Sequence, residues 1–298
     1  MSNLNFKEIS FEDIHKIKKY LVQDDSKCTD YTFGFLTMWG KVLNLMFSVY
    51  NETLFVKGTF RGGRELFYMP CGKMSLKDSV SAVVEYCKEK GISPEFVSIP
   101  FEKLESFKEH FNVEYTESRD YSDYVYSAEK LAFLKGRKYH QKRNHISGFK
   151  KRYPDYEFEI INDENIDLVK KFFEEFINLN EAESESEEIE RKCSEYALNN
   201  IKNMDLIGAL IKVGGKVIAF TLGEVKNDVL YVHVEKADRD FKGSYPTINS
   251  DFVKHCLEKY GISWVNREDD SGDMGLRKAK LSYYPEMFAV KGKVKILL

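Results

Sequence analysis

The sequence predicts an α/β (α+β) protein made of two tandem units, each with antiparallel strands flanked by helices. Three observations support this fold class: amphipathic helical stretches alternate with short apolar strands, a glycine pair separates two strands, and two sequence segments recur in the same order. The first repeat begins at Phe6 and recurs at Phe158, an offset of 152 positions (158 − 6 = 152). Each copy leads into a helix behind a good N-cap residue, Ser10 or Asn162.

The second repeat lies at the end of a helix. Residues 87–93 match residues 256–263, and each copy runs through a glycine, a common residue just after a helix, into a predicted strand. Two repeats in one order favour duplication of a single α/β unit over coincidence. We therefore expect an N-terminal domain over residues 1–128 and a C-terminal domain over residues 129–298, the latter carrying the expected active site.

The second unit has the clearer pattern of elements. Its first predicted helix carries an apolar stripe, and Gly214 and Gly215 mark the turn of a hairpin. In chain order we expect a helix over 137–153, a strand over 156–161, a helix from about 163, strands over 206–213, 217–222 and 229–234, helices over 246–260 and 275–282 separated by a strand over 262–265, and a last strand over 287–297.

The composition describes an ordinary folded protein without a strong overall charge. The 298 residues are 43% hydrophobic and 31% charged, and the formal net charge is −3. A polyanion would therefore need a local basic patch. The five cysteines are scattered without a CxxC pair, which argues against a disulfide framework and against a zinc site, so we expect no metal. A polar N-terminus and the absence of an 18-residue apolar run predict a cytoplasmic protein.

The stretch over residues 266–285 is the most informative part of the sequence for function. It follows the predicted strand over 262–265 and combines charged residues of both signs with two tyrosines and two glycines. An open α/β sheet usually builds its site at the carboxyl ends of its strands. The pattern therefore favours a functional site over a solvated turn.

The order of elements in the second unit resembles the GNAT-type acyltransferase fold, and the 266–285 stretch resembles one branch of it. Ten positions look like the signature of the phosphatidylglycerol lysyltransferase C-terminal-domain family: Asn266, Arg267, Asp269, Gly275, Leu276, Arg277, Lys278, Lys280, Tyr283 and Pro285. Residues 136–144 and 241–249 are also similar to this family. The resemblance implies two tandem GNAT-like acyltransferase domains, each a mixed, mostly antiparallel sheet flanked by helices, as in the related Fem-type aminoacyltransferases.

The resemblance implies transfer of an acyl group onto an amine or hydroxyl acceptor. The donor is aminoacyl-tRNA in the Fem and lysyltransferase branches and acyl-CoA in most other GNAT proteins. We therefore expect aminoacyl transfer from charged tRNA by direct attack of the acceptor. The alternatives are an acyl-CoA-dependent N-acyltransferase and a catalytically inactive GNAT-like binding module. The sequence lacks the membrane-spanning part of true lipid lysyltransferases, which argues against a lipid acceptor, but a small molecule, a peptide and a lipid head group all stay open.

Five residues of the 266–285 stretch are the candidate catalytic groups. Glu268 and Asp269 can take the proton of the acceptor or hold its ammonium group, or they can form salt bridges to neighbouring arginines. Arg277 and Lys280 lie three positions apart, so they can face one side of a helical turn and hold a phosphate or the oxyanion, or else form a solvated face. Tyr283 can protonate the leaving group, or it is a packing residue.

Substrate-binding positions are expected in the same stretch and in a basic segment before it. Residues 135–152 hold eight lysines and arginines without an intervening acid, which suits a tRNA backbone and equally suits a solvated helix face. The candidate substrate-binding residues are Asn266, Arg267, Gly275, Lys138, Lys142, Arg143 and Asn144.

The loop over residues 239–244 lies where a GNAT fold binds the CoA pyrophosphate. Lys242 and Ser244 occupy the two positions at which that fold usually has glycine, so the pattern is incomplete and the acyl-CoA interpretation is weaker. Gly243 with Ser244 can still cap the next helix and receive one phosphate. The candidate cofactor-binding residues are Lys242, Gly243, Ser244 and Tyr245.

Two other features have ordinary explanations. Residues 181–190 hold six glutamates and are expected to form a flexible, solvated connection, or a lid that holds a cationic acceptor. His233 lies on a predicted strand and is expected to be a satisfied core histidine rather than a base. Ser271 and Ser282 have no plausible histidine partner nearby, and the sequence shows no nucleophilic triad and no phosphate-binding glycine motif.

Overall fold

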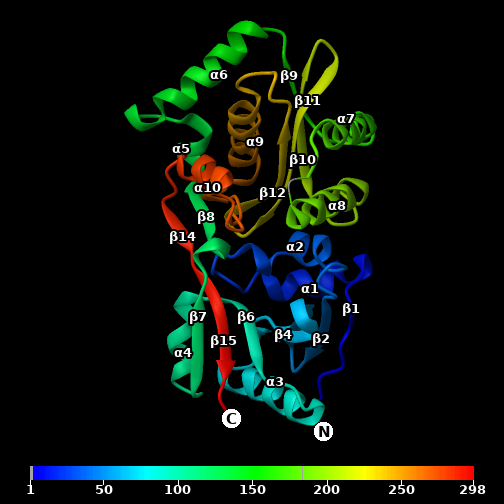
Figure 1. The fold of residues 1–298 in the computed structure, drawn as a ribbon, viewed down its shortest axis with the longest axis vertical. Coiled ribbons are helices and arrows are strands. Elements are labelled where there is room, and N and C mark those ends of the chain that lie inside the picture. The colour runs from blue at the N-terminus through cyan, green and yellow to red at the C-terminus, as the bar shows by residue number, and fades with distance from the viewer. Residues whose placement is uncertain (1–2, 183) are drawn as a thin grey trace. The chain divides into compact units, whose positions relative to one another are not determined.

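The computed structural model describes residues 3–182 and 184–298. The chain divides into two compact units (Figure 1). The first contains the chain up to Tyr124 together with Asp269–Arg277 and Phe288–Leu298, and the second contains Val125–Glu268 and Lys278–Met287. This differs from the expected boundary at residue 128, which separated two domains that were each continuous in sequence. Neither observed unit is continuous, because the chain returns to the first unit twice.

The first unit is built on an eight-stranded sheet with the order β1-β2-β3-β4-β6-β15-β7, in which β5 also pairs with β3. Its strands are β1 (Lys7–Glu8), β2 (Met46–Tyr50), β3 (Thr53–Phe60), β4 (Arg64–Phe67), β5 (Cys71–Gly72), β6 (Glu95–Pro100), β7 (Val113–Glu117) and β15 (Lys291–Ile296). Its helices are α1 (Ile14–Leu21), α2 (Phe33–Met38), α3 (Leu76–Lys90) and α4 (Leu104–Lys108).

The last strand of the chain belongs to the sheet of the first unit. β15 lies between β6 and β7 and pairs antiparallel with both. The sequence-based expectation assigned this strand to the second domain. Its hydrogen-bonding partners instead belong to the first unit, so residues close to the C-terminus complete a sheet that begins near the N-terminus.

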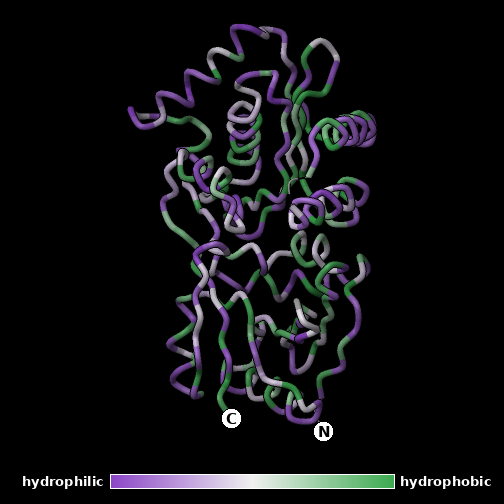
Figure 2. Tube along the Cα trace, viewed as in Figure 1, coloured by the Kyte–Doolittle hydropathy of each residue, from purple (hydrophilic) through white to green (hydrophobic). Residues whose placement is uncertain are grey.

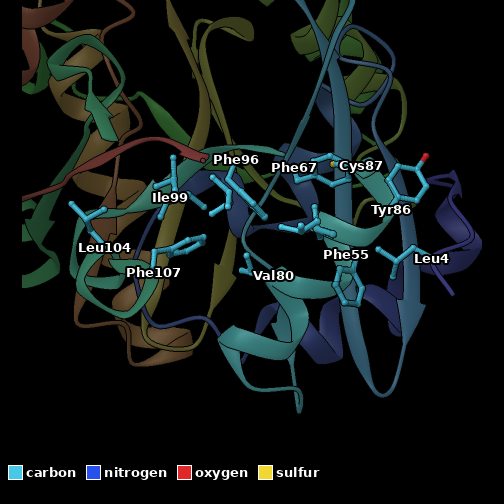
Figure 3. Packing of buried hydrophobic residues seen from close by; sticks show 14 residues of the cluster. Leu4, Phe55, Phe67, Val80, Tyr86, Cys87, Phe96, Ile99, Leu104 and Phe107 are labelled. Atoms are coloured by element: carbon cyan, nitrogen blue, oxygen red, sulfur yellow. The ribbon is translucent and has the colours of Figure 1, made fainter. Parts of the chain in front are cut away.

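Aromatic side chains form the core of the first unit (Figure 3). Phe67 on β4, Phe96 on β6 and Phe107 on α4 pack in series, with successive ring centroids 6.1 Å and 5.5 Å apart. Cys87 from α3 and Val294 from β15 are fully buried in the same cluster. The C-terminal strand is therefore part of the hydrophobic core as well as of the sheet.

The second unit is built on a seven-stranded sheet with the order β14-β8-β13-β12-β11-β10-β9. Helices α7 and α8 cover one face of this sheet, and α9 covers the other (Figure 1). The strands of this sheet are β8 (Asp123–Ser127), β9 (Glu157–Ile160), β10 (Ile207–Val213), β11 (Lys216–Lys226), β12 (Val229–Ala237), β13 (Trp264–Asn266) and β14 (Met287–Ala289). The helices of the second unit are α5 (Ala128–Phe133), α6 (His140–Arg152), α7 (Ile166–Leu179), α8 (Glu185–Asn199) and α9 (Ser244–Tyr260). The boundary between the units falls within β8, β14 and α10 (Met274–Leu281).

The two copies of the second sequence repeat fold alike. Helices α3 and α9 each end at a glycine in the left-handed conformation, Gly91 with φ 67° and Gly261 with φ 66°. The strand that follows each helix pairs parallel with an earlier strand of its sheet, β6 with β4 and β13 with β12. The neighbouring strand pairs are antiparallel. The predicted fold class of two mixed, mostly antiparallel sheets is confirmed.

Residues 185–190 of the acidic segment are helical, so the expected flexible connection is wrong for this part of it, and residue 183 lies outside the described residues. Helix α8 begins at Glu185, and the hydroxyl of Ser184 accepts a hydrogen bond from the N–H of Glu187 at 3.2 Å. Acidic residues in the first turn of a helix interact favourably with its dipole. Glu185, Glu187 and Glu188 therefore mark a helix start, and the same helix buries Cys193 and Leu198.

Among the described residues, no helix combines the length and the apolar composition needed to cross a bilayer.

Candidate functional site

The parallel strands β12 and β13 pair only briefly. Their ladder joins residues 229–231 to residues 264–266. His233 and Glu235 lie further along β12, and Arg267 and Glu268 follow β13. Nη2 of Arg267 lies 2.8 Å from Oε1 of Glu235, and Nδ1 of His233 lies 2.8 Å from Oε1 of Glu268. Two charged pairs therefore link the carboxyl ends of these strands.

Side chains from separate elements gather around Arg267, and we call them the Arg267 cluster: Lys142, Glu235, Asn249, Arg267 and Tyr283. Cζ of Arg267 lies 4.9 Å and Nζ of Lys142 lies 3.9 Å from the centroid of the Tyr283 ring. Nδ2 of Asn249, on α9, donates to Oε2 of Glu235 at 3.0 Å. Two cations thus share one aromatic ring, and one carboxylate offsets part of their charge.

Two polar atoms of the Arg267 cluster are buried and, within the described part of the chain, have no hydrogen-bond partner. They are Nη1 of Arg267, a donor, and Oδ1 of Asn249, an acceptor. Most buried polar atoms in folded proteins are paired, and an unpaired one costs about 1–3 kcal/mol. Both atoms belong to side chains that bind Glu235. A polar substrate can form hydrogen bonds with both of these atoms.

The ionisable groups of the cluster differ in their protonation. Burial lowers the pKa of Lys142 to about 8, and the charge of Arg267 acts in the same direction, against the opposing effect of Glu235. Burial also raises the pKa of the Tyr283 hydroxyl to about 12. Burial opposes the charge of Arg267 too, but Glu235 outweighs it and raises the pKa of that guanidinium. The cluster therefore holds one permanent cation, one titratable amine and one neutral phenol.

His233 is engaged at both ring nitrogens. Nε2 lies 2.9 Å from Oε1 of Glu224, and Nδ1 lies 2.8 Å from Oε1 of Glu268. Burial favours the neutral ring, but the hydrogen bonds to the two glutamates outweigh it and raise the pKa of His233 to about 10. The expectation of a satisfied core histidine is confirmed. No pattern in the sequence indicated that the His233 ring would be charged.

Lys280 and Asn266, two of the predicted site residues, support the backbone of this segment. Nζ of the buried Lys280 donates to the carbonyl oxygen of Arg267 at 2.6 Å. Oδ1 of Asn266 accepts from the N–H of Glu268 at 2.6 Å. This bond accompanies a left-handed conformation at Glu268, where φ is 59°. Both side chains thus hold Arg267 and Glu268 in position.

Arg277, another predicted catalytic residue, is an ion-pair partner within the first unit. Its Nε and Nη2 lie 2.9 Å and 2.6 Å from the two carboxylate oxygens of the buried Asp270. Nη2 also lies 2.6 Å from Oδ1 of Asp120. Arg277 and Lys280 therefore bind different partners, whereas the sequence predicted a shared anion site.

Asp269 is a predicted catalytic residue, whereas its neighbour Asp270 was not predicted. The carboxylate of Asp269 accepts hydrogen bonds from the N–H and the hydroxyl of Ser271 at 3.0 Å and 2.9 Å, which closes a tight turn. Gly275 lies in the first turn of α10 and is exposed. Asp270 is fully buried.

The basic segment of the sequence is only partly exposed. Nη1 of Arg143 donates to the carbonyl oxygens of Leu134 and Gly136 at 2.5 Å and 2.6 Å. Lys142 faces Tyr283, while Asn144 is exposed. Figure 2 shows that the trace along α6 is mostly hydrophilic. The exposed cations of the segment are Lys135, Arg137, Lys138, Lys151 and Arg152.

The predicted pyrophosphate loop packs against α6. A Cβ atom at Gly243 would lie 2.5 Å from the carbonyl oxygen of His145 and 2.9 Å from Cβ of Phe149. Since Gly243 has φ 99°, both its conformation and this contact favour glycine. Lys242 is exposed and Tyr245 is half-buried. The backbone at the start of α9 is therefore covered by another helix.

The first turn of α9 has few backbone donors to offer an anion. The N–H groups of Ser244 and Thr247 donate to the carbonyl oxygens of Phe241 and Gly243 at 2.9 Å and 3.1 Å. Pro246, between them, has no N–H. A pyrophosphate would therefore find little of the hydrogen bonding that helix starts usually provide.

Glu235 and Asn249 of the cluster were not among the predicted site residues. A signal for Glu235 exists in the sequence, because it lies two positions after His233 in an otherwise apolar strand, and such residues share one face. Asn249 lies within a helix, where its role depends on the strand packed against it. Among the described residues, no group of three or more histidine, cysteine or acidic side chains is arranged to hold a metal ion.

The two units, each with a GNAT-like sheet and flanking helices, define a tandem GNAT-like protein. The chain belongs to the phosphatidylglycerol lysyltransferase C-terminal family, whose model matches residues 25–290. This is the family that the 266–285 stretch resembles, so the expectation from the sequence is confirmed.

The chain is similar to known proteins in structure and in sequence. A solved protein of unknown function from Bacteroides thetaiotaomicron is 32% identical, with a TM-score of 0.93 over 99% of this chain and 100% of that one. The C-terminal domain of a putative lysylphosphatidylglycerol synthetase from Agrobacterium fabrum is 13% identical, with a TM-score of 0.68 over 96% of this chain and 92% of that one. An uncharacterized protein of Mycoplasmoides gallisepticum is 26% identical over 201 residues, and the match covers 65% of this chain and 62% of that protein.

Proposed function

We propose that the chain transfers an aminoacyl group from charged tRNA to an amine or hydroxyl acceptor, with the Arg267 cluster as the reaction centre. The observation that carries this proposal is the buried Nη1 of Arg267, a charged donor that has no acceptor among the described residues. Acyl transfer builds negative charge on the carbonyl oxygen of the ester, and a donor fixed in advance stabilises that charge. Membership of the family supports this class of reaction.

Three neighbouring groups hold Arg267 in position for this role. Glu235 binds one edge of its guanidinium, Lys280 binds its backbone carbonyl oxygen, and the ring of Tyr283 lies 4.9 Å from Cζ. The unpaired Oδ1 of Asn249 supplies an acceptor for an amine of the aminoacyl group or of the acceptor. Groups fixed in this way need little reorganisation during the reaction.

Direct attack by the acceptor suits the chain better than a covalent enzyme intermediate. A thiol nucleophile needs exposure and a low pKa. The five cysteines are buried, and burial raises the pKa of both Cys193 and Cys256 to about 12. In the direct reaction the acceptor nitrogen or oxygen forms a bond to the ester carbonyl carbon. The bond from that carbon to the ribose oxygen breaks, and the ribose hydroxyl leaves.

Two features favour tRNA over acyl-CoA as the donor. The start of α9 packs against α6, and its first turn has few free N–H groups for a pyrophosphate. The outer face of α6 and of the loop before it instead carries exposed cations spread along the chain, which suits successive phosphates of a nucleic acid. The acceptor is a small molecule, a peptide or a lipid head group that presents an amine or a hydroxyl.

Retention of bulk charged tRNA on the full chain tests the donor. Saturable binding at about 50 mM salt should fall steeply by about 200 mM salt, because released counterions drive phosphate binding. Coenzyme A should not compete. Turnover is then followed with glycinamide, a small primary amine, as the probe acceptor, measured against a protein-free control. Absence of retention at low salt overturns the tRNA proposal, and retention without any turnover favours the binding-module alternative.

A further inference from the structure

Lys142 lies on the side of α6 that faces Tyr283. Its side chain is half-buried, and Nζ lies 3.9 Å from the ring centroid. Within the described part of the chain this amine has no hydrogen-bond acceptor. Two other basic residues of the same helix differ: Arg143 binds backbone carbonyl groups, and Lys150 pairs with Asp251 at 3.6 Å. A half-buried amine without an acceptor is costly to keep charged and is left free for a substrate.

The surroundings of Lys142 disfavour its ammonium form relative to that of an ordinary lysine. Burial and the like charge of Arg267 both oppose the ammonium, Glu235 supports it, and the pKa of Lys142 is lowered to about 8. The two neighbouring charges that act on Lys142 are Arg267 after β13 and Glu235 on β12. The surrounding elements also carry Asp251 on α9, Tyr283 after α10, and Lys138, His140, Arg143, His145 and Lys150 on or just before α6.

The carboxylates of this region are already bound to cations. Glu235 lies 2.8 Å from Arg267, and Glu268 lies 2.8 Å from the charged His233. Glu235 and the predicted base Glu268 therefore each already bind a cation, whereas Nζ of Lys142 has no carboxylate partner among the described residues.

We propose that Lys142 is the general base of the transfer reaction, an inference that rests on the proposed function. The neutral amine takes the proton of the acceptor as the acceptor atom forms its bond to the ester carbonyl carbon. The resulting ammonium gives that proton to the ribose oxygen as the ester bond breaks. Lys142 is neutral again at the end, and no further reactant is needed. Contact with the Tyr283 ring stabilises the ammonium formed between the two steps.

The titration of Lys142 is measurable without a substrate. Reductive methylation of the full chain with ¹³C-formaldehyde labels its lysine amines for NMR, and Lys142→Arg identifies the resonance of interest. Its midpoint should lie near pH 8, and Arg267→Met should move it upward by removing a like charge. The resonance lost in Lys150→Arg is the assignment control, because Lys150 lies on the same helix and pairs with Asp251. A Lys142 midpoint near the ordinary value of about 10.4 overturns the proposal.

The kinetic test uses bulk charged tRNA with glycinamide as the acceptor. Lys142→Arg keeps the charge but cannot give up its proton near neutral pH, so transfer should slow by about a hundredfold or more. It should also lose the rise in rate as the pH passes through 8, while retention of charged tRNA stays unchanged. Lys150→Arg should keep the wild-type rate and pH profile.

A wild-type rate in Lys142→Arg overturns the base role. Failure of the wild-type chain to retain or use charged tRNA is a separate result, which overturns the proposed function and the base role with it.

Discussion

The guanidinium of Arg277 holds both carboxylate oxygens of Asp270, with Nε 2.9 Å from Oδ2 and Nη2 2.6 Å from Oδ1. Asp270 is fully buried, and its carboxylate also accepts a hydrogen bond from the hydroxyl of Tyr124. Burial opposes its ionisation, but the hydrogen bonds from Arg277 and Tyr124 outweigh that effect and lower the pKa of Asp270 to about 2. An arginine of the family-like stretch therefore acts first as a structural partner inside the first unit.

Replacing Arg277 should destabilise the protein. Arg277→Met leaves the buried Asp270 carboxylate without its main partner, and an uncompensated buried carboxylate costs about 3–5 kcal/mol. The measurement is the free energy of unfolding in urea. Lys278→Met is the control, because it removes a cation from an exposed neighbouring position of the same helix. Equal stability of the two variants would show that the Asp270 pair contributes little.

Acid should remove the contribution of the same pair. Because the folded-state pKa of Asp270 lies below the ordinary value of 3.8, its stabilisation is complete above that value. It is lost as the pH falls from about 4 towards 2, where the folded carboxylate takes up its proton. Urea unfolding at several acidic pH values should show this slope in the wild type and a smaller one in Asp270→Asn.

Lys291 should be essential for the first unit. This lysine of β15 is buried, and its ammonium binds Asp30 and also Asp123, the latter at 2.9 Å. Lys291→Met leaves two buried carboxylates with no cation between them, and breaking a buried pair costs about 3–5 kcal/mol. Lys293→Met, on the exposed side of the same strand, should change the unfolding free energy little. Similar losses in both variants would contradict a specific role for Lys291.

His233 should make the stability of the second unit depend on alkaline pH. Its folded-state pKa of about 10 lies above the ordinary value of 6.5, so its stabilising effect is complete below 6.5. This stabilisation should be lost as the pH rises from about 7 towards 10, and the free energy of unfolding should fall by about 1.4 kcal/mol per pH unit at most. Thermal or urea unfolding across this range should show a decline that His233→Asn reduces. His140→Asn, an exposed substitution, should leave the decline intact.

Local patterns predicted many elements of the second unit, but they missed helix α8 and the division of the last predicted strand into β14 and β15. The elements that were predicted have local causes. The glycines at 214 and 215 fix the hairpin, and Gly261 ends α9 as its repeat partner Gly91 ends α3. The place of β15 was not predictable in this way. Its alternating sequence tells which side chains are buried but not which sheet supplies its hydrogen-bonding neighbours, since that depends on contacts far away along the chain.

The candidate site was predictable only in part. Arg267 and Tyr283 follow from the 266–285 stretch, but the choice between Asp269 and Asp270 depends on left-handed residues at Glu268 and Ser271, with φ 59° and 46°. No periodicity in the sequence encodes those conformations, because neither residue is a glycine. The same limit explains why the position of Lys142 was not predicted. In the sequence Lys142 is one of a run of basic residues expected to be exposed, but in the structure its side chain faces Tyr283.

Arg267 is the residue whose replacement should separate catalysis from tRNA binding. Arg267→Lys keeps a positive charge but loses the planar guanidinium, which uses one nitrogen for Glu235 and leaves Nη1 for the substrate. Transfer of the aminoacyl group to glycinamide should fall about 100–1000-fold, the range seen when a single oxyanion donor is removed. Retention of charged tRNA should change little, because the exposed cations of the basic segment are intact.

Arg191→Lys is the control, since Arg191 is a buried arginine of the same unit that pairs with Glu187 at 2.8 Å and lies outside the cluster. A parallel loss of retention and transfer in Arg267→Lys would assign Arg267 to binding, and a wild-type rate would remove the Arg267 cluster from the reaction.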